Sequence, residues 1–552
     1  MTQIIVYTAR RIHTMDPGRP HATAIAVMDG KVLSTGTLES MKPWLDRHPF
    51  VVDNTLIDKV IVPGFIDPHT HFYVSSGYMG LHYVGPIESI GTEGTSPGLL
   101  TADDVVEKIR AVCANEPDKN AALCFWGLDP AAQGIEFDRN SLDAIVGDRP
   151  VWVITYAPHF VYLSSAALAR LDIDDSCDVH GVMHYPDGRL SGVFAELDAK
   201  RIAFAAMQKE LNRGAGAPGL RRMAEVARRA GVTTTAEMLW GYINPDVEWQ
   251  AHNEAVNHPD FPLRMGLVPV ENAAYRRLGE GAAEWIASLA PRSTDKLFFH
   301  GVKFLSDGSF PALSSRLNFP GYLDGSNGLR NDVPYDQMAA RMLPFWQRNI
   351  PIHCHANGDE ALDATLNALA QLQEAKPRFD HRFTVEHYTI NNPMQARRLK
   401  ALGGLASVNN YFVHYRSQLH SEKGYGPDRS EAVARLATLE REGVTFALHS
   451  DSWLVVVPLH PLTAVWCAVN RLALDGKTVV APGECIGIER AMRAVTIDAA
   501  YVIGKENELG SLEPGKHADF AILEEDPYEV DAVRIRDIRV WGTALGGKLQ
   551  PA

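Results

Sequence analysis

The sequence predicts an α/β fold: a (β/α)8 TIM-type barrel, a small β-sandwich domain built from both termini, and a large insertion after strand 1. Three features support it. Strand-like and helical patterns alternate through the middle of the chain, both ends carry strand-like segments, and about 160 residues separate the first two candidate barrel strands. We expect residues 1–59 plus 510–552 to form the sandwich, 60–509 the barrel, and about 72–218 an inserted subdomain.

Both ends of the chain show strand and turn chemistry. Near the start, an Asp29-Gly30 turn joins two apolar segments. Neither end is long enough to make a good core alone, so we expect the two ends to associate. The segments are residues 4–6, 24–27, 31–33, 518–523 and 540–545.

Eight segments in the middle are candidate barrel strands, with helical patterns between several of them. The strands are residues 60–68, 231–238, 262–270, 298–305, 350–355, 382–387, 404–408 and 444–450. The clearest helices are residues 219–230, 338–348, 360–374, 393–402 and 430–442. Alternation of this kind is typical of parallel strands in a closed barrel.

Composition excludes several classes of protein. With 552 residues, 46% of them hydrophobic, the chain can bury a large core. A formal net charge of −14 with no basic run argues against a nucleic-acid partner. No stretch reaches the roughly 20 apolar residues that cross a bilayer, and the start lacks a signal-peptide core. We therefore expect a cytoplasmic protein with no membrane partner. We also expect it to act on a small molecule and to form a homo-oligomer, namely a dimer.

The first barrel strand ends in His69 and His71. Because side chains alternate along a strand, both imidazoles lie on one face and can converge on one cation. The motif alone is weak evidence, since histidine pairs of this spacing also arise by chance on protein surfaces.

Four other strand ends add chemistry. In this barrel class, catalytic residues collect where the strands end, so coincidence explains the pattern poorly. Each residue also has a structural explanation: a lysine that reaches the rim, a core histidine, an aspartate that caps a turn. His353 shares a face with His355, which we favour because it lies nearer the strand end. The four residues are Lys303, His355, His387 and Asp451.

Substrate contacts are harder to predict. The candidates are Trp126 and His159 in the insertion, and His414 and Trp453 in the loops after strands seven and eight. Most aromatic residues belong to cores, but this apolar bias favours a hydrophobic or aromatic N-substituent on the substrate.

Several motifs together resemble a known family. They are VPGFIDPHTH at 62–71, GVKFLSDGS at 301–309, HCHANGD at 353–359, VEH at 385–387, SDS at 450–452 and the tail at 497–523. The chain resembles the amidohydrolase superfamily over nearly its whole length, specifically the family-3 branch with YtcJ-like proteins and N-substituted formamide deformylases.

The resemblance implies a metal-dependent hydrolase that acts on a carbon-nitrogen bond other than a peptide bond, with one or two divalent ions, zinc above all. In it, Lys303 is a carbamate bridging two ions and Asp451 is both ligand and general base. The implied metal-binding residues are His69, His71, Lys303, His355, His387 and Asp451.

Three alternatives stay open. One kind of metal site can hydrolyse many kinds of bond, so the reaction could be cyclic amide opening, deamination or ester hydrolysis. A noncatalytic metal-binding barrel would show missing ligands, and none is missing. A phosphotriesterase-like or urease-like hydrolase would use bound metal in the same way, but the insertion and terminal sandwich favour family 3.

Overall fold

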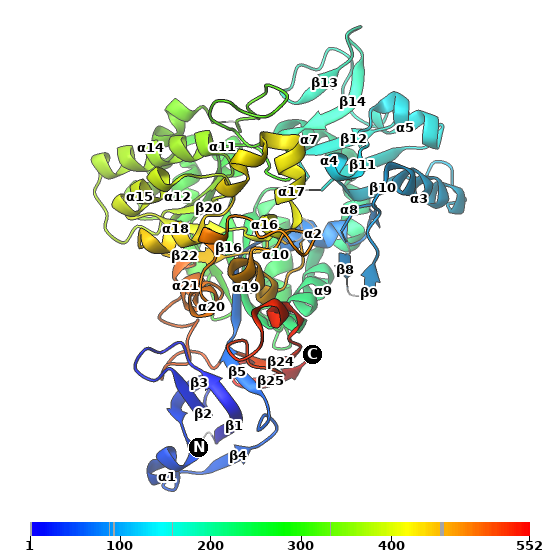
Figure 1. Ribbon diagram of the computed structural model, residues 1–552. Helices are drawn as coiled ribbons and strands as arrows, with labels where there is room; N and C mark the ends of the chain where they lie inside the picture. Colours follow the sequence, from blue (N-terminus) through cyan, green and yellow to red (C-terminus); the bar gives the residue numbers. More distant parts are fainter. Residues whose placement is uncertain (1–2, 88, 92–93, 157, 332, 453–456) are drawn as a thin grey trace.

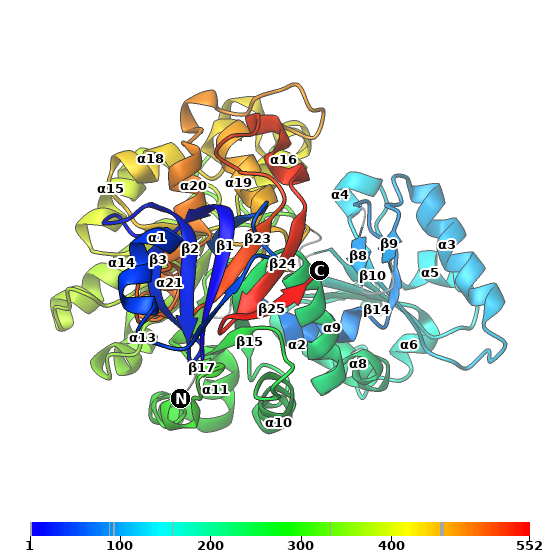
Figure 2. The ribbon, with the colours of Figure 1, turned by 90° about the horizontal axis from the view of Figure 1, so that it is seen from below.

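A computed structural model describes the chain except residues 1–2, 88, 92–93, 157, 332 and 453–456 (Figure 1). Parallel sheet and helices make up the body of the molecule. A terminal sheet lies at one end of the body, and the inserted subdomain stands to one side of it in both views (Figures 1 and 2). In the described residues, no helix is long and apolar enough to cross a membrane.

The two ends of the chain share one eight-stranded sheet, ordered β25-β24-β23-β5-β1-β2-β3 with β4 paired to β1. Its central junction is the antiparallel pair β5–β23, in which Ile61 lies opposite Ile522. Tyr7, Ile61 and Phe520 are buried in one cluster against this sheet. The strands are β1 (Ile4–His13), β2 (His21–Met28), β3 (Lys31–Gly36), β4 (Phe50–Asp53), β5 (Val60–Pro63), β23 (Phe520–Leu523), β24 (Val540–Leu545) and β25 (Lys548–Pro551).

The predicted first barrel strand is in fact two strands, β5 and β6 (Phe65–Thr70), which separate at Gly64. A Cβ atom at Gly64 would lie 2.0 Å from Oγ1 of Thr233, so glycine is needed for this close approach. β5 joins the terminal sheet, whereas β6 pairs in parallel with β15. The single strand predicted over 60–68 was therefore wrong, and Gly64 is where the chain passes between the sheets.

The remaining predicted barrel strands form two parallel sheets, ordered β17-β16-β15-β6 and β18-β19-β20-β21-β22. Isolated parallel bridges connect these two sheets, Val270 with Lys303 and Thr70 with Ser452. The strands are β15 (Val232–Trp240), β16 (Arg264–Pro269), β17 (Leu297–Phe299), β18 (Val302–Leu305), β19 (Ile352–Ala356), β20 (Thr384–His387), β21 (Leu405–Val408) and β22 (Phe446–Leu448).

The predicted strand 298–305 is also broken, into β17 and β18, at His300 and Gly301. Gly301 has φ +71°, and a Cβ atom there would lie 2.8 Å from the Pro351 carbonyl oxygen. This conformation suits glycine and interrupts the strand, so β17 pairs with β16 while β18 pairs with β19.

Helices follow most of these strands, as the alternation predicts. Four of the five predicted helices are present: α9 (Gly216–Arg229), α13 (Met338–Gln347), α14 (Asp359–Ala375) and α15 (Pro393–Ala401). The fifth, predicted over 430–442, is a 3-10 helix, η5 (Pro427–Ala432), and a short helix, α18 (Leu436–Arg441). The buried guanidinium of Arg471 donates to the carbonyl oxygens of Val433 and Ala434 at 2.8 Å each. These hydrogen bonds stabilise the non-helical segment between η5 and α18.

The insertion has a six-stranded sheet of its own, ordered β13-β14-β12-β11-β10-β7. Helices α3 (Ala102–Asn115) and α5 (Arg139–Val146) contribute to a separate apolar cluster with it. Two further helices, α7 (Glu196–Ala206) and α8 (Gln208–Gly214), lead the chain back to the body. The strands are β7 (His82–Tyr83), β10 (Leu123–Leu128), β11 (Val151–Thr155), β12 (Phe160–Leu163), β13 (Val182–His184) and β14 (Leu190–Ala195).

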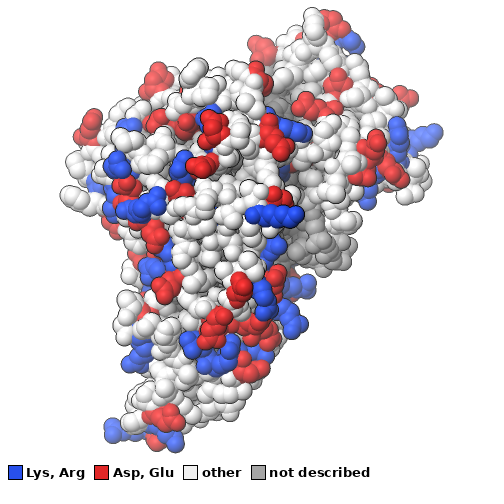
Figure 3. Space-filling view, viewed as in Figure 1, with Lys and Arg blue, Asp and Glu red and all other residues white. Residues whose placement is uncertain are grey.

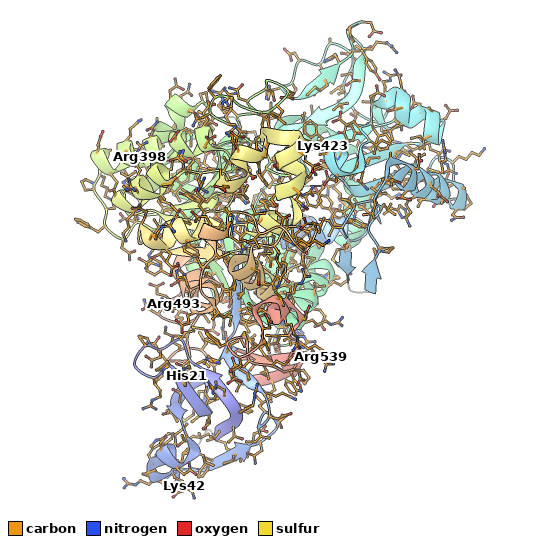
Figure 4. All side chains as sticks on the ribbon, viewed as in Figure 1. His21, Lys42, Arg398, Lys423, Arg493 and Arg539 are labelled. Carbon is orange, nitrogen blue, oxygen red and sulfur yellow. The ribbon has the colours of Figure 1, made fainter. Side chains whose placement is uncertain are left out.

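Polar contacts tie the insertion to the body. The buried Arg416 forms an ion pair with Asp129, and its guanidinium lies 4.0 Å from the ring centre of Tyr156. Lys423, labelled in Figure 4, donates to the Ala131 carbonyl oxygen at 2.9 Å across the same junction. Elsewhere on the face shown in Figure 3, acidic and basic side chains are interspersed.

Candidate active site

A cavity of about 330 Å³ opens where the parallel strands end. Its lining includes every residue that the sequence predicted as a metal ligand, and all of these side chains are buried. They are His69, His71, Lys303, His355, His387 and Asp451.

Strand ends place each of these side chains. His69 lies near the end of β6, Lys303 in β18, and His387 is the last residue of β20. His387 and Asp451 have φ of +73° and +59°, a backbone conformation that is uncommon outside glycine. The backbone N–H of Asp451 donates to the His69 carbonyl oxygen at 3.0 Å, which holds this residue beside β6.

The facing atoms lie close together. Asp451 Oδ1 is 2.9 Å from His71 Nε2 and 3.4 Å from His69 Nε2. His69 Nε2 is also 3.3 Å from Lys303 Nζ, and the rings of His355 and His387 are 4.5 Å apart. Ligand atoms of His69, His71 and Asp451 all lie within 4.8 Å of one another, a spacing that suits one metal ion.

A single carboxylate orients two of the buried histidines. Glu386 accepts hydrogen bonds of 2.6 Å from Nδ1 of His69 and Nδ1 of His353. Burial raises the pKa of Glu386, but the hydrogen bond from His353 and nearby charges outweigh it and bring the pKa to about 2. The carboxylate therefore stays ionised and both rings donate through Nδ1, which leaves the Nε2 lone pair of His69 facing the cavity.

Electrostatics keep His355 and His387 in the form that binds metal. In His71, burial lowers the pKa, but the hydrogen bond to Asp451 and the one to Glu237 outweigh it and raise the pKa above its ordinary value. Burial, followed by the charge of Lys303, lowers the pKa of His355 to about 3. The pKa of His387 falls well below its ordinary value, from burial and then from His355. Burial also lowers the pKa of the Lys303 amine. Neutral imidazoles can donate a lone pair to a cation, whereas protonated ones cannot.

Asp67 connects the ends of β6 and β22. It accepts a 2.5 Å hydrogen bond from the Ser450 hydroxyl and further bonds from the backbone N–H groups of Ser450 and His69. Burial raises the pKa of Asp67 to about 7, against the opposing effect of these bonds. Asp67 thus fixes the segment that carries Asp451 next to the one that carries His69.

The predicted substrate contacts have different positions. His159 lines the cavity. Trp126 is buried in β10 with its ring stacked 6.0 Å from Tyr78, and His414 donates from Nδ1 to the Leu472 carbonyl oxygen at 2.8 Å; neither lines the cavity. Trp453 lies outside the described residues. These positions do not support Trp126 and His414 as direct substrate contacts.

A sequence profile described as "Amidohydrolase family" matches residues 56–550. The chain belongs to the amidohydrolase family. This confirms the resemblance seen in the sequence motifs and supports a hydrolase of that superfamily.

Relatives within this family span nearly the whole chain. Protein LONG AFTER FAR-RED 3 of Arabidopsis thaliana is 26% identical, over 99% of this chain and 91% of its own length. The N-substituted formamide deformylase of Arthrobacter pascens is 23% identical, over 100% and 98%. Among solved structures, an uncharacterized metal-dependent hydrolase from Pyrococcus horikoshii has a TM-score of 0.70 at 19% identity, covering 96% of this chain and 99% of that one.

Two further side chains lie beside the predicted ligands, in addition to Glu386, His353 and Asp67. The His449 ring stacks on His69 at 4.4 Å, and its ring nitrogens form a second metal-capable group with His69 and His387. Glu237 Oε1 lies 3.6 Å from His71 Nδ1. Both residues lie at or near strand ends, which was the available signal, but only the folded structure shows which strand-end side chains meet.

Proposed function

We propose that this protein is a metal-dependent amidohydrolase that cleaves a carbon-nitrogen bond, an amide, N-acyl or N-formyl bond, in a small molecule. The observation that carries the proposal is the convergence of six candidate ligands from five separate strand ends on one buried cavity. The similarity to an N-substituted formamide deformylase supports this choice of bond.

The donor set fits a divalent metal. Imidazole nitrogens and carboxylate oxygens suit zinc, and the buried Nδ1 atom of His387 makes no hydrogen bond to a described residue. We propose one or two zinc ions, held by His69 and His71 at one position and His355 and His387 at the other, with Asp451 as a further ligand. Such an ion, when bound, acidifies water and polarises the scissile carbonyl.

Lys303 completes this arrangement as a carbamate. The amine lies 3.3 Å from His69 Nε2 in a fully buried position, where an ammonium would repel bound cations and lose its hydration. A carbamate, formed when carbon dioxide adds to the neutral amine with loss of one proton, would instead supply anionic oxygens as metal ligands. We therefore propose that Lys303 would be a ligand shared by the two metal positions.

Asp451 is the proposed general base and acid. Its carboxylate faces both His69 and His71 and lines the cavity, so it can take the proton of the attacking water. The same oxygen can pass that proton to the departing nitrogen, which avoids expelling an amide anion. Glu386 holds the His69 ring in the tautomer that this arrangement requires.

The fold that we propose for this chemistry is one (β/α)8 barrel, of which the two parallel sheets are parts. The bridges Val270–Lys303 and Thr70–Ser452 support closure at both sheet edges. The terminal sheet, with apolar clusters around Tyr7 and around Val6, would be the sandwich domain. We also propose a cytoplasmic homodimer, which light scattering after gel filtration can test.

One experiment tests the function: elemental analysis of the purified protein together with hydrolysis of a panel of formamides, N-acyl amines, cyclic amides and esters. We expect one or two divalent ions per chain and turnover of linear amides. Turnover of cyclic amides or esters alone would instead assign a different amidohydrolase reaction. Bound metal without any turnover would favour the noncatalytic barrel.

A further inference from the structure

The cavity changes in character between its base and its mouth. The histidine cluster forms the base, and apolar side chains, among them Phe204, Leu239 and Phe412, form the wall. Ile243 lies further out, 43% exposed to solvent. A ligand that reacts at the base therefore extends past apolar surface before it reaches water.

Helix α7 of the insertion places a cation on this path. Arg201, Phe204 and Ala205 line the cavity, and their spacing of three and four residues puts them on one helix face. Arg201 is exposed, and it forms no ion pair with a carboxylate among the described residues. Its guanidinium can therefore bind a ligand at the mouth of the cavity, on the same helix face as the apolar residues of the wall.

The outer lining of the cavity carries positive charge in an acidic protein. The formal net charge is −14, yet two cationic side chains of α7, Lys200 and Arg201, line the cavity. Among the described lining positions, Asp451 and the proposed carbamate of Lys303 both belong to the proposed metal site. The buried Lys200 donates to the Pro158 carbonyl oxygen, which holds the segment before His159 against α7. Cationic side chains at this part of the lining favour anionic ligands in an otherwise acidic protein.

We infer that the substrate carries an anionic group, represented by a carboxylate, beyond an apolar segment that adjoins the scissile bond, and that Arg201 binds it. This inference rests on the proposed function for the position of the scissile bond. An arginine fork matches the two oxygens of a carboxylate, and the apolar wall accommodates the part of the molecule between the two ends.

Three matched compounds test the inference: N-formyl-4-(aminomethyl)benzoate, its neutral primary carboxamide, and N-formylbenzylamine. Each is assayed with the metal-loaded wild type, Arg201→Ala and Arg201→Lys. Lys209→Ala is the matched control, because Lys209 is an exposed cation on the next helix, α8, that does not line this cavity.

We expect the wild type to favour the carboxylate over the carboxamide about tenfold in kcat/KM, as one charge-assisted contact provides. Arg201→Ala should remove this preference, because KM for the carboxylate rises while its kcat is unchanged. Arg201→Lys should keep part of the preference, and Lys209→Ala should keep all of it. Turnover of N-formylbenzylamine should be equal in all variants, which verifies that they fold. The preference should also weaken as salt is added, since Arg201 is exposed.

Calorimetric binding of the same compounds separates this inference from the proposed function. If the wild type hydrolyses none of them but binds the carboxylate more tightly than Arg201→Ala does, the choice of reaction is wrong and the anion site stands. If all three are hydrolysed with equal efficiency, or if Arg201→Ala keeps the wild-type preference, the anion site is wrong and the function stands. Equal binding by both proteins without turnover overturns both.

Discussion

The base and the mouth of the cavity are built in different ways. At the base, the side chains come from strand ends and are locked by buried contacts, such as the two 2.6 Å hydrogen bonds that Glu386 accepts. At the mouth, they come from the insertion and from the loop after β15, and residues such as Arg201 and Ile243 are exposed. Rigid chemistry and adjustable recognition therefore occupy separate parts of the chain.

This difference predicts separable effects of substitution. Changes at the base should alter turnover and metal content, whereas changes at the mouth should alter substrate affinity with the metal retained. Loss of metal in a variant of the mouth would contradict this division of roles between base and mouth.

Lys303→Ala should have the largest effect, because it removes both the proposed bridge between the ions and the amine next to His69 Nε2. We expect no measurable turnover in a steady-state assay. Short carboxylic acids, supplied with bicarbonate, should restore part of the activity by replacing the missing oxygens. Electron density for an unmodified lysine in metal-loaded crystals equilibrated with carbon dioxide would reject the bridge, whatever the rescue assay showed.

Asp451→Asn should follow, with kcat lowered by about 10²–10⁴-fold, the usual range for loss of a general acid-base. Asparagine keeps the shape and one oxygen but cannot take the proton of water. KM should change little, and steady-state kinetics measures both quantities. An unchanged kcat would transfer the proton-handling role to another residue.

Much of the base could be predicted from the sequence, because its residues follow local rules. The alternation of His69 and His71, and the polar residues that end successive strands, are visible without a structure. The breaks at Gly64 and Gly301 were not, since each depends on a close approach to a residue distant in sequence, Thr233 in one case and Pro351 in the other. The mouth was still less predictable, because α7 reaches the cavity only through tertiary packing of the insertion.

Asp129→Asn tests how the insertion is held. It leaves the buried guanidinium of Arg416 without its partner while the side chain can still cap helix α4 (Pro130–Gln133). Breaking a buried ion pair in this way costs about 3–5 kcal/mol, so the denaturation midpoint should fall markedly. Arg397→Ala, which removes the exposed Arg397–Glu442 pair, should leave the midpoint unchanged. Equal effects of the two substitutions would contradict a structural role for the junction.

Glu386→Gln should have a smaller effect, on metal affinity more than on the fold. The glutamine amide has a single acceptor oxygen, so it can accept a hydrogen bond from only one of the two histidines in the present arrangement. The tautomers of His69 and His353 are then no longer both fixed. Loss of the hydrogen bond that orients a metal-binding histidine typically lowers metal affinity by about 10–100-fold. Competition with a chelator measures this directly, and the exposed Glu422→Gln is the control. Wild-type affinity in the Glu386 variant would show that the carboxylate only fills space.

The smallest effects should distinguish His159 from Trp126, two residues that the sequence predicted as substrate contacts. His159 lines the cavity beside Pro158, whereas Trp126 is 4% exposed and packs its ring against Tyr78 and Tyr83. His159→Ala should raise KM about two- to tenfold, the effect of one lost hydrogen bond, with metal content unchanged. Trp126→Phe should leave KM unchanged and lower thermal stability instead, because it removes buried ring surface from the insertion. Steady-state kinetics and thermal unfolding on the same samples separate the two. If Trp126→Phe shifted KM as much as His159→Ala did, the recognition surface would extend through the cavity wall into the core of the insertion, and the division between rigid base and adjustable mouth would need to be redrawn there.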